Sequence, residues 1–164
     1  MKKQKDALLS LIKECLNMKE PINPYSTQQP KYEHRNLEFQ ERHQKNIQKV
    51  INSNLTKAII SDSITQIWPS VGEKSWNKYN NGKFINLGIG YDIIENVLYR
   101  VYHDEIEIEC INLDKIILLI GTNNIGLNNN TEIVNGIKFL VNQIHIRQPG
   151  ADLFVLGIFA KRRL

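Results

Sequence analysis

The sequence lacks three features, each of which would have pointed to a particular class of protein. No apolar run approaches the roughly 20 residues of a membrane-spanning helix, so we expect no membrane span. The two cysteines, Cys15 and Cys110, stand far apart without metal-site spacing, which favours a reducing compartment and predicts a cytoplasmic location. Although the net charge is +4, no basic stripe alternates with aromatic residues, so we expect no nucleic-acid partner.

The first part of the chain resembles neither a secretory signal nor a folded domain. Charged residues interrupt its apolar positions, and no small-residue cleavage site follows them. Apolar residues from Leu8 to Leu16 recur at helical spacing, which predicts a short amphipathic helix, and residues 20–34 are rich in proline and polar side chains. We therefore expect a helix and linker over residues 1–34 and a folded domain over residues 35–164.

Within the expected domain, short apolar runs alternate with segments of helical periodicity. A polar helix is predicted from about Leu37 to Ile51, and two more helices contain the apolar positions of residues 93–101 and 133–144. Four mostly apolar runs suit strands that are buried on both faces: residues 57–60, 83–87, 115–120 and 153–156. This alternation predicts an α/β fold with a parallel sheet and helices on both faces.

Polar motifs follow the first three predicted strands. They are Ser61-Asp62-Ser63, Asn86-Leu87-Gly88-Ile89-Gly90-Tyr91-Asp92 and Gly121-Thr122-Asn123-Asn124. The carboxyl ends of parallel strands share one edge of the sheet, where ligands bind in open α/β folds. A serine at a helix start, an amide-rich turn and an asparagine could supply a nucleophile and the donors for its oxyanion.

Each motif also has a purely structural interpretation. Asp62 or Ser63 could simply cap a helix, the glycines could form a tight turn, and Asn123 could bond its own backbone. The pair Gly88 and Gly90 lacks the third glycine of a dinucleotide-binding fingerprint, which makes a nucleotide site the weakest alternative.

Taken together and in order, the three motifs resemble the first three sequence blocks of the SGNH (GDSL-type) hydrolases. The similarity is greatest to the catalytic subunits of intracellular platelet-activating-factor acetylhydrolase. It extends to Trp76, to Val97-Leu98-Tyr99-Arg100 and to Arg147-Gln148-Pro149-Gly150-Ala151, and it covers residues from about 40 to 160. The resemblance implies a flavodoxin-like three-layer fold, with sheet order 2-1-3-4 for the strands present and a fifth strand lacking.

The resemblance also implies a role for each matched residue. Ser63 would be the nucleophile, Asn123 would donate its side-chain amide to the oxyanion, and Tyr91 would donate its backbone N–H. Two positions depart from the family pattern: Ser61 and Tyr91 both stand where the family has glycine. Glycine adopts conformations that other residues resist, and the Tyr91 ring could also crowd the pocket.

The largest departure concerns the general base. The family places an Asp-x-x-His block after a further helix and strand, and the sequence ends at Leu164 without one. Of the four histidines, His34 and His43 precede the predicted sheet, whereas His103 and His145 fall at helix ends, where a helix dipole favours them. We therefore expect an impaired hydrolase, because an unactivated serine is a weak nucleophile.

Two functions thus follow from the sequence. The first is hydrolysis of a small ester with a short acyl or acetyl group, through a Ser63 acyl-enzyme and without a metal or organic cofactor. The alternative is a non-catalytic binding or interaction protein on the same fold. An unprotected, apolar fourth strand also predicts self-association of the chain.

Overall fold

The computed structural model describes residues 26–31, 37–106 and 111–158. Within them lies a four-stranded parallel sheet of order β2-β1-β3-β4, so the predicted fold class and strand order are confirmed. The strands are β1 (Lys57–Ser61), β2 (Ile85–Asn86), β3 (Lys115–Leu119) and β4 (Asp152–Val155). The amphipathic helix expected near Leu8 and most of the expected linker lie outside the described residues.

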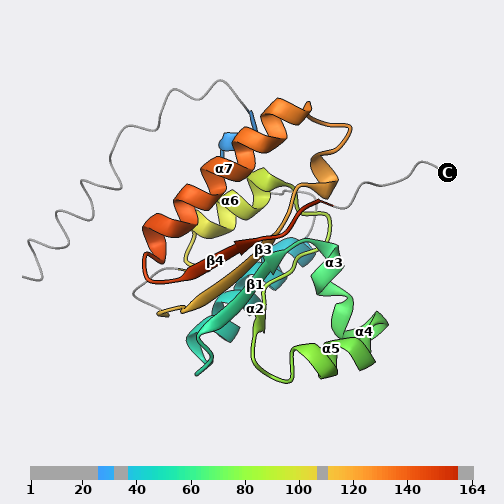
Figure 1. Cartoon of the computed structure of the whole chain (residues 1–164), viewed down its shortest axis with the longest axis vertical. Coiled ribbons are helices and arrows are strands. Elements are labelled where there is room, and N and C mark those ends of the chain that lie inside the picture. The colour runs from blue at the N-terminus through green and yellow to red at the C-terminus, as the bar shows by residue number, and fades with distance from the viewer. Residues whose placement is uncertain (1–25, 32–36, 107–110, 159–164) are drawn as a thin grey trace, which may run out of the picture.

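Helices cover both faces of this sheet. The longer ones are α2 (Leu37–Ile51), α6 (Ile94–Tyr102) and α7 (Asn130–Arg147), and the shorter are α3 (Ser63–Gln66), α4 (Trp68–Val71) and α5 (Glu73–Tyr79). Figure 1 shows α6 and α7 together on one side of the strands and α3–α5 on the other side. Two 3-10 turns, η1 (Ser26–Gln28) and η2 (Thr122–Asn124), complete the described elements.

The core lies between one face of the sheet and helices α2, α6 and α7. Side chains from all of these elements form a single buried cluster, which includes Val50, Ile60, Leu98, Leu118 and Leu140. Burying side chains of this size stabilises a fold by about 1.5–3 kcal/mol each. The inner positions of β1 and β3 are continuously apolar because helices cover both faces of the sheet.

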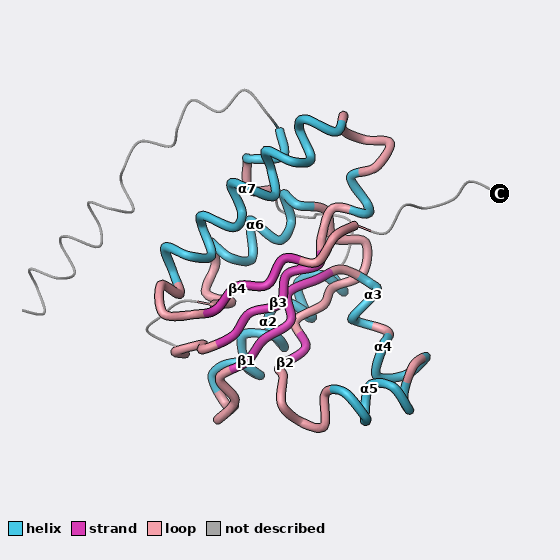
Figure 2. The backbone as a smooth tube through the Cα atoms, viewed as in Figure 1, coloured by secondary structure: helices cyan, strands magenta, loops and turns pink. Residues whose placement is uncertain are grey.

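Strand β2 is shorter than the run that predicts it. It pairs with β1 at only two positions, yet the backbone N–H groups of Leu87 and Ile89 continue to donate to Ile59 O and Ser61 O. The chain therefore stays beside β1 as it enters the glycine-containing turn. Figure 2 shows the four strands side by side.

The segment that contains η1 packs on the helices rather than standing apart. The side chain of Thr27 is fully buried and donates to Glu132 O at 2.8 Å. A Cβ at Gly136 of α7 would lie 2.6 Å from the Thr27 Cβ, so the glycine makes the room that Thr27 occupies. The division of the chain near residue 34 stays a prediction, but residues 26–31 contact α6 and α7.

Candidate active site

Ser63 is the first residue of α3 and directly follows the turn that ends β1. Asp62 is the helix N-cap, and its Oδ1 accepts a hydrogen bond of 2.9 Å from the Ile64 N–H. The capping interpretation therefore belongs to Asp62, while Ser63 is half-buried at a helix start, where the dipole favours negative charge. Burial raises the pKa of the Asp62 carboxyl, and the hydrogen bond from Ile64 opposes that rise.

The turn after β2 approaches the Ser63 turn so closely that a glycine is required. A Cβ at Gly88 would lie 2.7 Å from Gln66 N and 2.9 Å from Asp62 O, both backbone atoms. The Ile89 N–H donates to Ser61 O at 3.1 Å, and the Gly90 N–H donates to the Gln66 side chain. These bonds hold the second motif against the first.

Tyr91 occupies the left-handed backbone region, with φ of 63°. This conformation favours glycine, which is the residue that the resemblance leads one to expect here. Its side chain is 85% exposed, so the ring extends into solvent. Among the described residues the Tyr91 N–H donates to no acceptor, whereas the amides of Gly88, Ile89, Gly90 and Asp92 all do.

Asn123 lies in η2, directly after β3, and its side chain reaches the second motif. Its Nδ2 donates to Asp92 O at 2.9 Å. An amide nitrogen carries two N–H groups, so the second remains for a ligand. The structure thus brings the motifs of Ser63, Tyr91 and Asn123 to one edge, as the sequence predicts, while the roles of these three residues remain predictions.

Asn124 is a site residue that the sequence pattern did not single out. It is fully buried; its Oδ1 accepts from the Ile94 N–H at 3.0 Å, and its Nδ2 donates to Glu95 at 2.9 Å and to Asn128 at 3.0 Å. It therefore fixes the loop of Asn123 against the start of α6. Only the neighbouring Asn123 could have drawn attention to it, because the partners that join it to α6, Ile94 and Glu95, lie far away in sequence.

The Ser61 side chain is fully buried at the end of β1. Its hydroxyl has no hydrogen-bond partner among the described residues, and its carbonyl oxygen accepts from Ile89. A serine therefore fits where the family has glycine, at the cost of one unpaired buried hydroxyl. That cost is about 1–3 kcal/mol for a typical buried polar group.

A buried ion pair lies directly behind the turn. Asp92 Oδ2 is 2.8 Å from Arg100 Nη2, and both side chains are almost completely buried. Burial raises the pKa of Asp92 to about 7, against the opposing attraction of Arg100. The neighbouring charges of Glu105 and Asp62 add to the rise.

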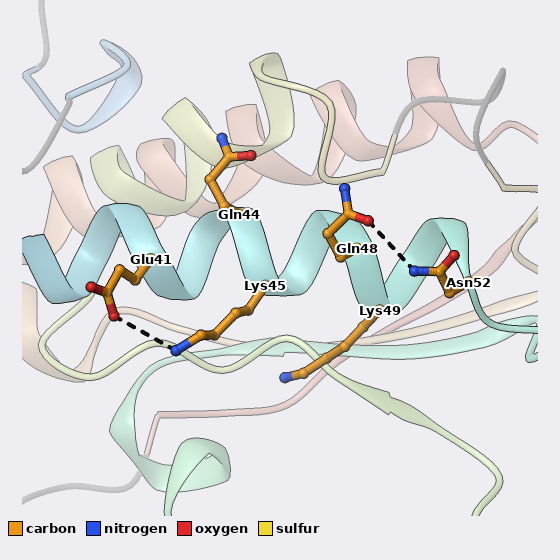
Figure 3. A pocket seen from close by; sticks show the side chains of 6 residues that line it. All are labelled: Glu41, Gln44, Lys45, Gln48, Lys49 and Asn52. Atoms are coloured by element: carbon orange, nitrogen blue, oxygen red, sulfur yellow. Dashed lines mark hydrogen bonds and ion pairs between the residues drawn. The ribbon is translucent and has the colours of Figure 1, made fainter.

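One shallow hollow runs along α2, and its lining residue Lys49 donates from Nζ to Asn86 O at 3.3 Å. Figure 3 shows its lining, in which Glu41 pairs with Lys45 at 3.6 Å and Asn52 donates to Gln48 at 3.5 Å. These side chains bond to one another one helical turn apart, which is typical of a solvated helix surface. The hollow therefore offers no convergent chemistry.

Comparison with solved structures identifies the fold. The chain superimposes on a protein from Streptococcus pneumoniae described as a proposed platelet activating factor, with a TM-score of 0.54 and 23% identity, covering 74% of this chain and 55% of that one. A proposed acylhydrolase from Bacteroides fragilis gives a TM-score of 0.55 and 17% identity, covering 76% and 58%. No protein-family model matches the chain.

Sequence comparison matches part of the chain to acetylhydrolase subunits. The chain is 38% identical over 77 residues to platelet-activating factor acetylhydrolase IB subunit alpha2 of Homo sapiens, and 35% identical over 77 residues to subunit alpha1 of Bos taurus. The chain is related to the SGNH-type hydrolases. Each match covers 47% of this chain, and the chain spans 32% of the length of these relatives.

An SGNH-type hydrolase needs a base beside its serine, and the described histidines lie elsewhere. Helices α6 and α7 begin at the edge that carries Ser63 and run back toward the opposite edge, so His103 and His145 near their ends lie away from it. His43 is buried against Phe39 and Tyr99, with its Nδ1 2.9 Å from Glu105. His34 lies outside the described residues.

No group of three or more His, Cys, Asp or Glu side chains in residues 26–31, 37–106 and 111–158 is arranged to hold a metal ion. Over the same ranges, no helix combines the length and the apolar character needed to cross a membrane.

Proposed function

We propose that this chain carries the nucleophile and oxyanion groups of an ester hydrolase that acts on short acyl or acetyl esters. The observation that supports it best is that the motifs of Ser63, Tyr91 and Asn123 follow strands whose ends share one sheet edge, with Asn123 Nδ2 bonded to Asp92 O beside Tyr91. The relationship to acetylhydrolase subunits supports the choice of a small acyl group.

The reaction would proceed through a covalent acyl-enzyme. The Ser63 Oγ attacks the ester carbonyl carbon, and the carbonyl oxygen becomes an oxyanion that accepts from the Tyr91 N–H and Asn123 Nδ2. The C–O bond to the alcohol then breaks, and the alcohol leaves with a proton. Water adds to the acyl-enzyme in the same way, releasing the acid and restoring Ser63.

The proton of the Ser63 hydroxyl needs an acceptor, and this step limits the proposed activity. Because the described histidines lie away from Ser63, we propose that these residues alone react slowly. Enzymes that lose a member of a serine triad keep roughly 10³–10⁴-fold catalysis over water through binding and the oxyanion hole.

A fluorophosphonate probe tests the nucleophile directly. We expect the folded chain to be labelled and Ser63→Ala to lose labelling by at least about 10²-fold, because the probe needs a reactive serine. Ser70→Ala is the matched control, since Ser70 also follows a helix start on the same side and bonds only to Ile67 O. Equal labelling of Ser63→Ala, or none of the folded wild-type chain, would overturn the proposal.

The second candidate is a binding or interaction protein that uses the same fold. It is favoured by β4 and the residue after it, because Phe154, Val155 and Leu156 are each about half exposed (50%, 48% and 46%). We propose that this strand pairs with a second copy of the chain, as an unprotected apolar edge tends to do. Sedimentation velocity over a series of concentrations would detect the dimer, and a monomer throughout would contradict it.

We also propose a cytoplasmic location, on the grounds that the two cysteines are far apart in sequence and match no disulfide framework. Fractionation of cells that produce the tagged chain would test this, and recovery outside the cytoplasm would contradict it.

A further inference from the structure

Four charged or titratable side chains form a buried cluster behind the turn of Tyr91. The members of this charge cluster are His43, Asp92, Arg100 and Glu105, and each is at most 5% exposed. Polar contacts connect them in series: His43 Nδ1 lies 2.9 Å from Glu105 Oε2, Glu105 Oε1 contacts Arg100 Nη1, and Arg100 Nη2 lies 2.8 Å from Asp92 Oδ2. None of these groups has a part in the acyl-transfer chemistry proposed above.

The guanidinium of Arg100 contacts three parts of the chain around the Tyr91 turn. Besides the two carboxylates, it donates to Leu87 O at 2.9 Å and to Ser61 O at 3.4 Å. Ser61 lies two residues before Ser63, Leu87 lies immediately before Gly88, and Asp92 lies immediately after Tyr91. One side chain from α6 therefore joins the end of β1, the start of the turn and the end of the turn.

The conformation of Tyr91 explains why such a clamp is needed. A left-handed backbone at a bulky residue is unfavourable and persists only where its surroundings fix it. Asp92, the next residue, is held twice: its carboxylate by Arg100 and its carbonyl oxygen by Asn123. The turn is thus fixed from α6 and from the β3 loop together.

A buried ion-pair cluster is in itself weak evidence of a stabilising role. Burying a charge series is expensive, and an apolar replacement of equal volume often gives a protein that is as stable or more stable. The charge cluster also donates hydrogen bonds to two carbonyl oxygens at strand ends. These directional bonds fix the positions of the two carbonyl groups, which apolar packing would not do. A planar fork of five donors suits this task, whereas the single ammonium of lysine does not.

We propose that Arg100 is a positioning residue that sets the Tyr91 amide relative to Ser63, with Glu105 and His43 holding its guanidinium in place. This inference rests on the proposed function, because the position matters for chemistry only if the amide is an oxyanion donor. A misplacement of about 1 Å at such a site can lower a rate by about 10²-fold.

The test compares Arg100→Lys with the wild-type chain in the rate of fluorophosphonate labelling per folded molecule. We expect a fall of about 10²-fold, because lysine keeps the charge but cannot hold both carboxylates and both carbonyl oxygens. Leu140→Ala is the control: it removes a fully buried core side chain of α7 outside the charge cluster and should label at the wild-type rate per folded molecule. Equal rates for Arg100→Lys and Leu140→Ala would overturn the proposal.

Amide hydrogen exchange separates failure of this inference from failure of the proposed function. If the wild-type chain is not labelled, the function fails, but positioning still predicts at least about tenfold faster exchange at Ile89 and Asp92 in Arg100→Lys than in Leu140→Ala. Equal exchange in the two variants would overturn the positioning role.

If Arg100→Lys does not fold, His43→Ala replaces it, because it removes the contact with Glu105 and leaves Arg100 in place. A reduction of about threefold in labelling, or about threefold faster exchange at the same two amides, supports the proposal. Wild-type values of both would overturn it.

Discussion

At the scale of single residues, Tyr91 is a residue type that fits its backbone conformation poorly. Its φ of 63° costs an L-residue roughly 1–2 kcal/mol, and its 85% exposed ring recovers little by burial. Glycine would relieve that cost but lose about 0.5–1 kcal/mol of backbone entropy. We expect Tyr91→Gly to raise the free energy of unfolding by about 0.5–1 kcal/mol in urea titrations.

Tyr91→Ala is the control for this prediction, because alanine removes the ring and keeps the Cβ that causes the strain. Its free energy of unfolding should stay close to the wild-type value. If the glycine variant unfolds more easily than the alanine variant, the left-handed conformation is not what limits stability at this position.

At this scale, the sequence predicts the place of a residue where that place depends on nearby strands. It does not predict a role that depends on partners far away in the sequence. Ser63 and Asn123 each directly follow a predicted strand, so the pattern alone brought them to one edge. The role of Asn124 rests on contacts to Ile94 and Glu95, about 30 residues away in sequence. The bonds of Arg100 to Ser61 and Leu87 are likewise invisible to periodicity.

At the scale of elements, apolar runs predicted strands well because β1, β3 and β4 are apolar at every position except at one or both ends. The run at residues 83–87 gave a strand of only two residues, since the chain already turns toward Gly88 there. The position of α2 beside α6 could not be predicted from its sparse apolar face. It depends on His43 and Asn46, polar residues that are buried through bonds to Glu105 and Leu87 O.

Strand β4 carries the prediction that belongs to this scale. Val155→Lys places a charge on the exposed edge, so we expect it to weaken the proposed dimer at least tenfold in sedimentation velocity, as edge lysines oppose strand pairing. Ile146→Lys is the matched control, because Ile146 is an equally exposed residue of α7, at 49%. Equal weakening by both substitutions would place the contact elsewhere than β4.

At the scale of the whole molecule, one buried charge series connects elements that are distant in the sequence. It starts at His43 in α2 and ends at Asp92, beside the candidate oxyanion donor. Helix α2 also donates to the same strand end, through Asn46 Nδ2 to Leu87 O at 3.2 Å. The stability of the fold and the geometry of the site therefore depend on the same buried polar groups.

This dependence predicts how stability changes with pH. Burial raises the pKa of Asp92 from 3.8 to about 7 in the folded chain, so between these values the folded state binds a proton that the unfolded state has lost. The contribution of Asp92 to the free energy of unfolding therefore falls as pH rises from about 4 to about 7, and it is constant above that.

The substitution Asp92→Asn tests this prediction, because it removes the titration of this side chain. Urea unfolding at intervals from pH 4 to pH 8 should show the difference between wild type and Asp92→Asn changing across this window and level above it. Parallel curves for the two chains would mean that Asp92 is already ionised in the folded state at pH 4, with Arg100 outweighing the effect of burial.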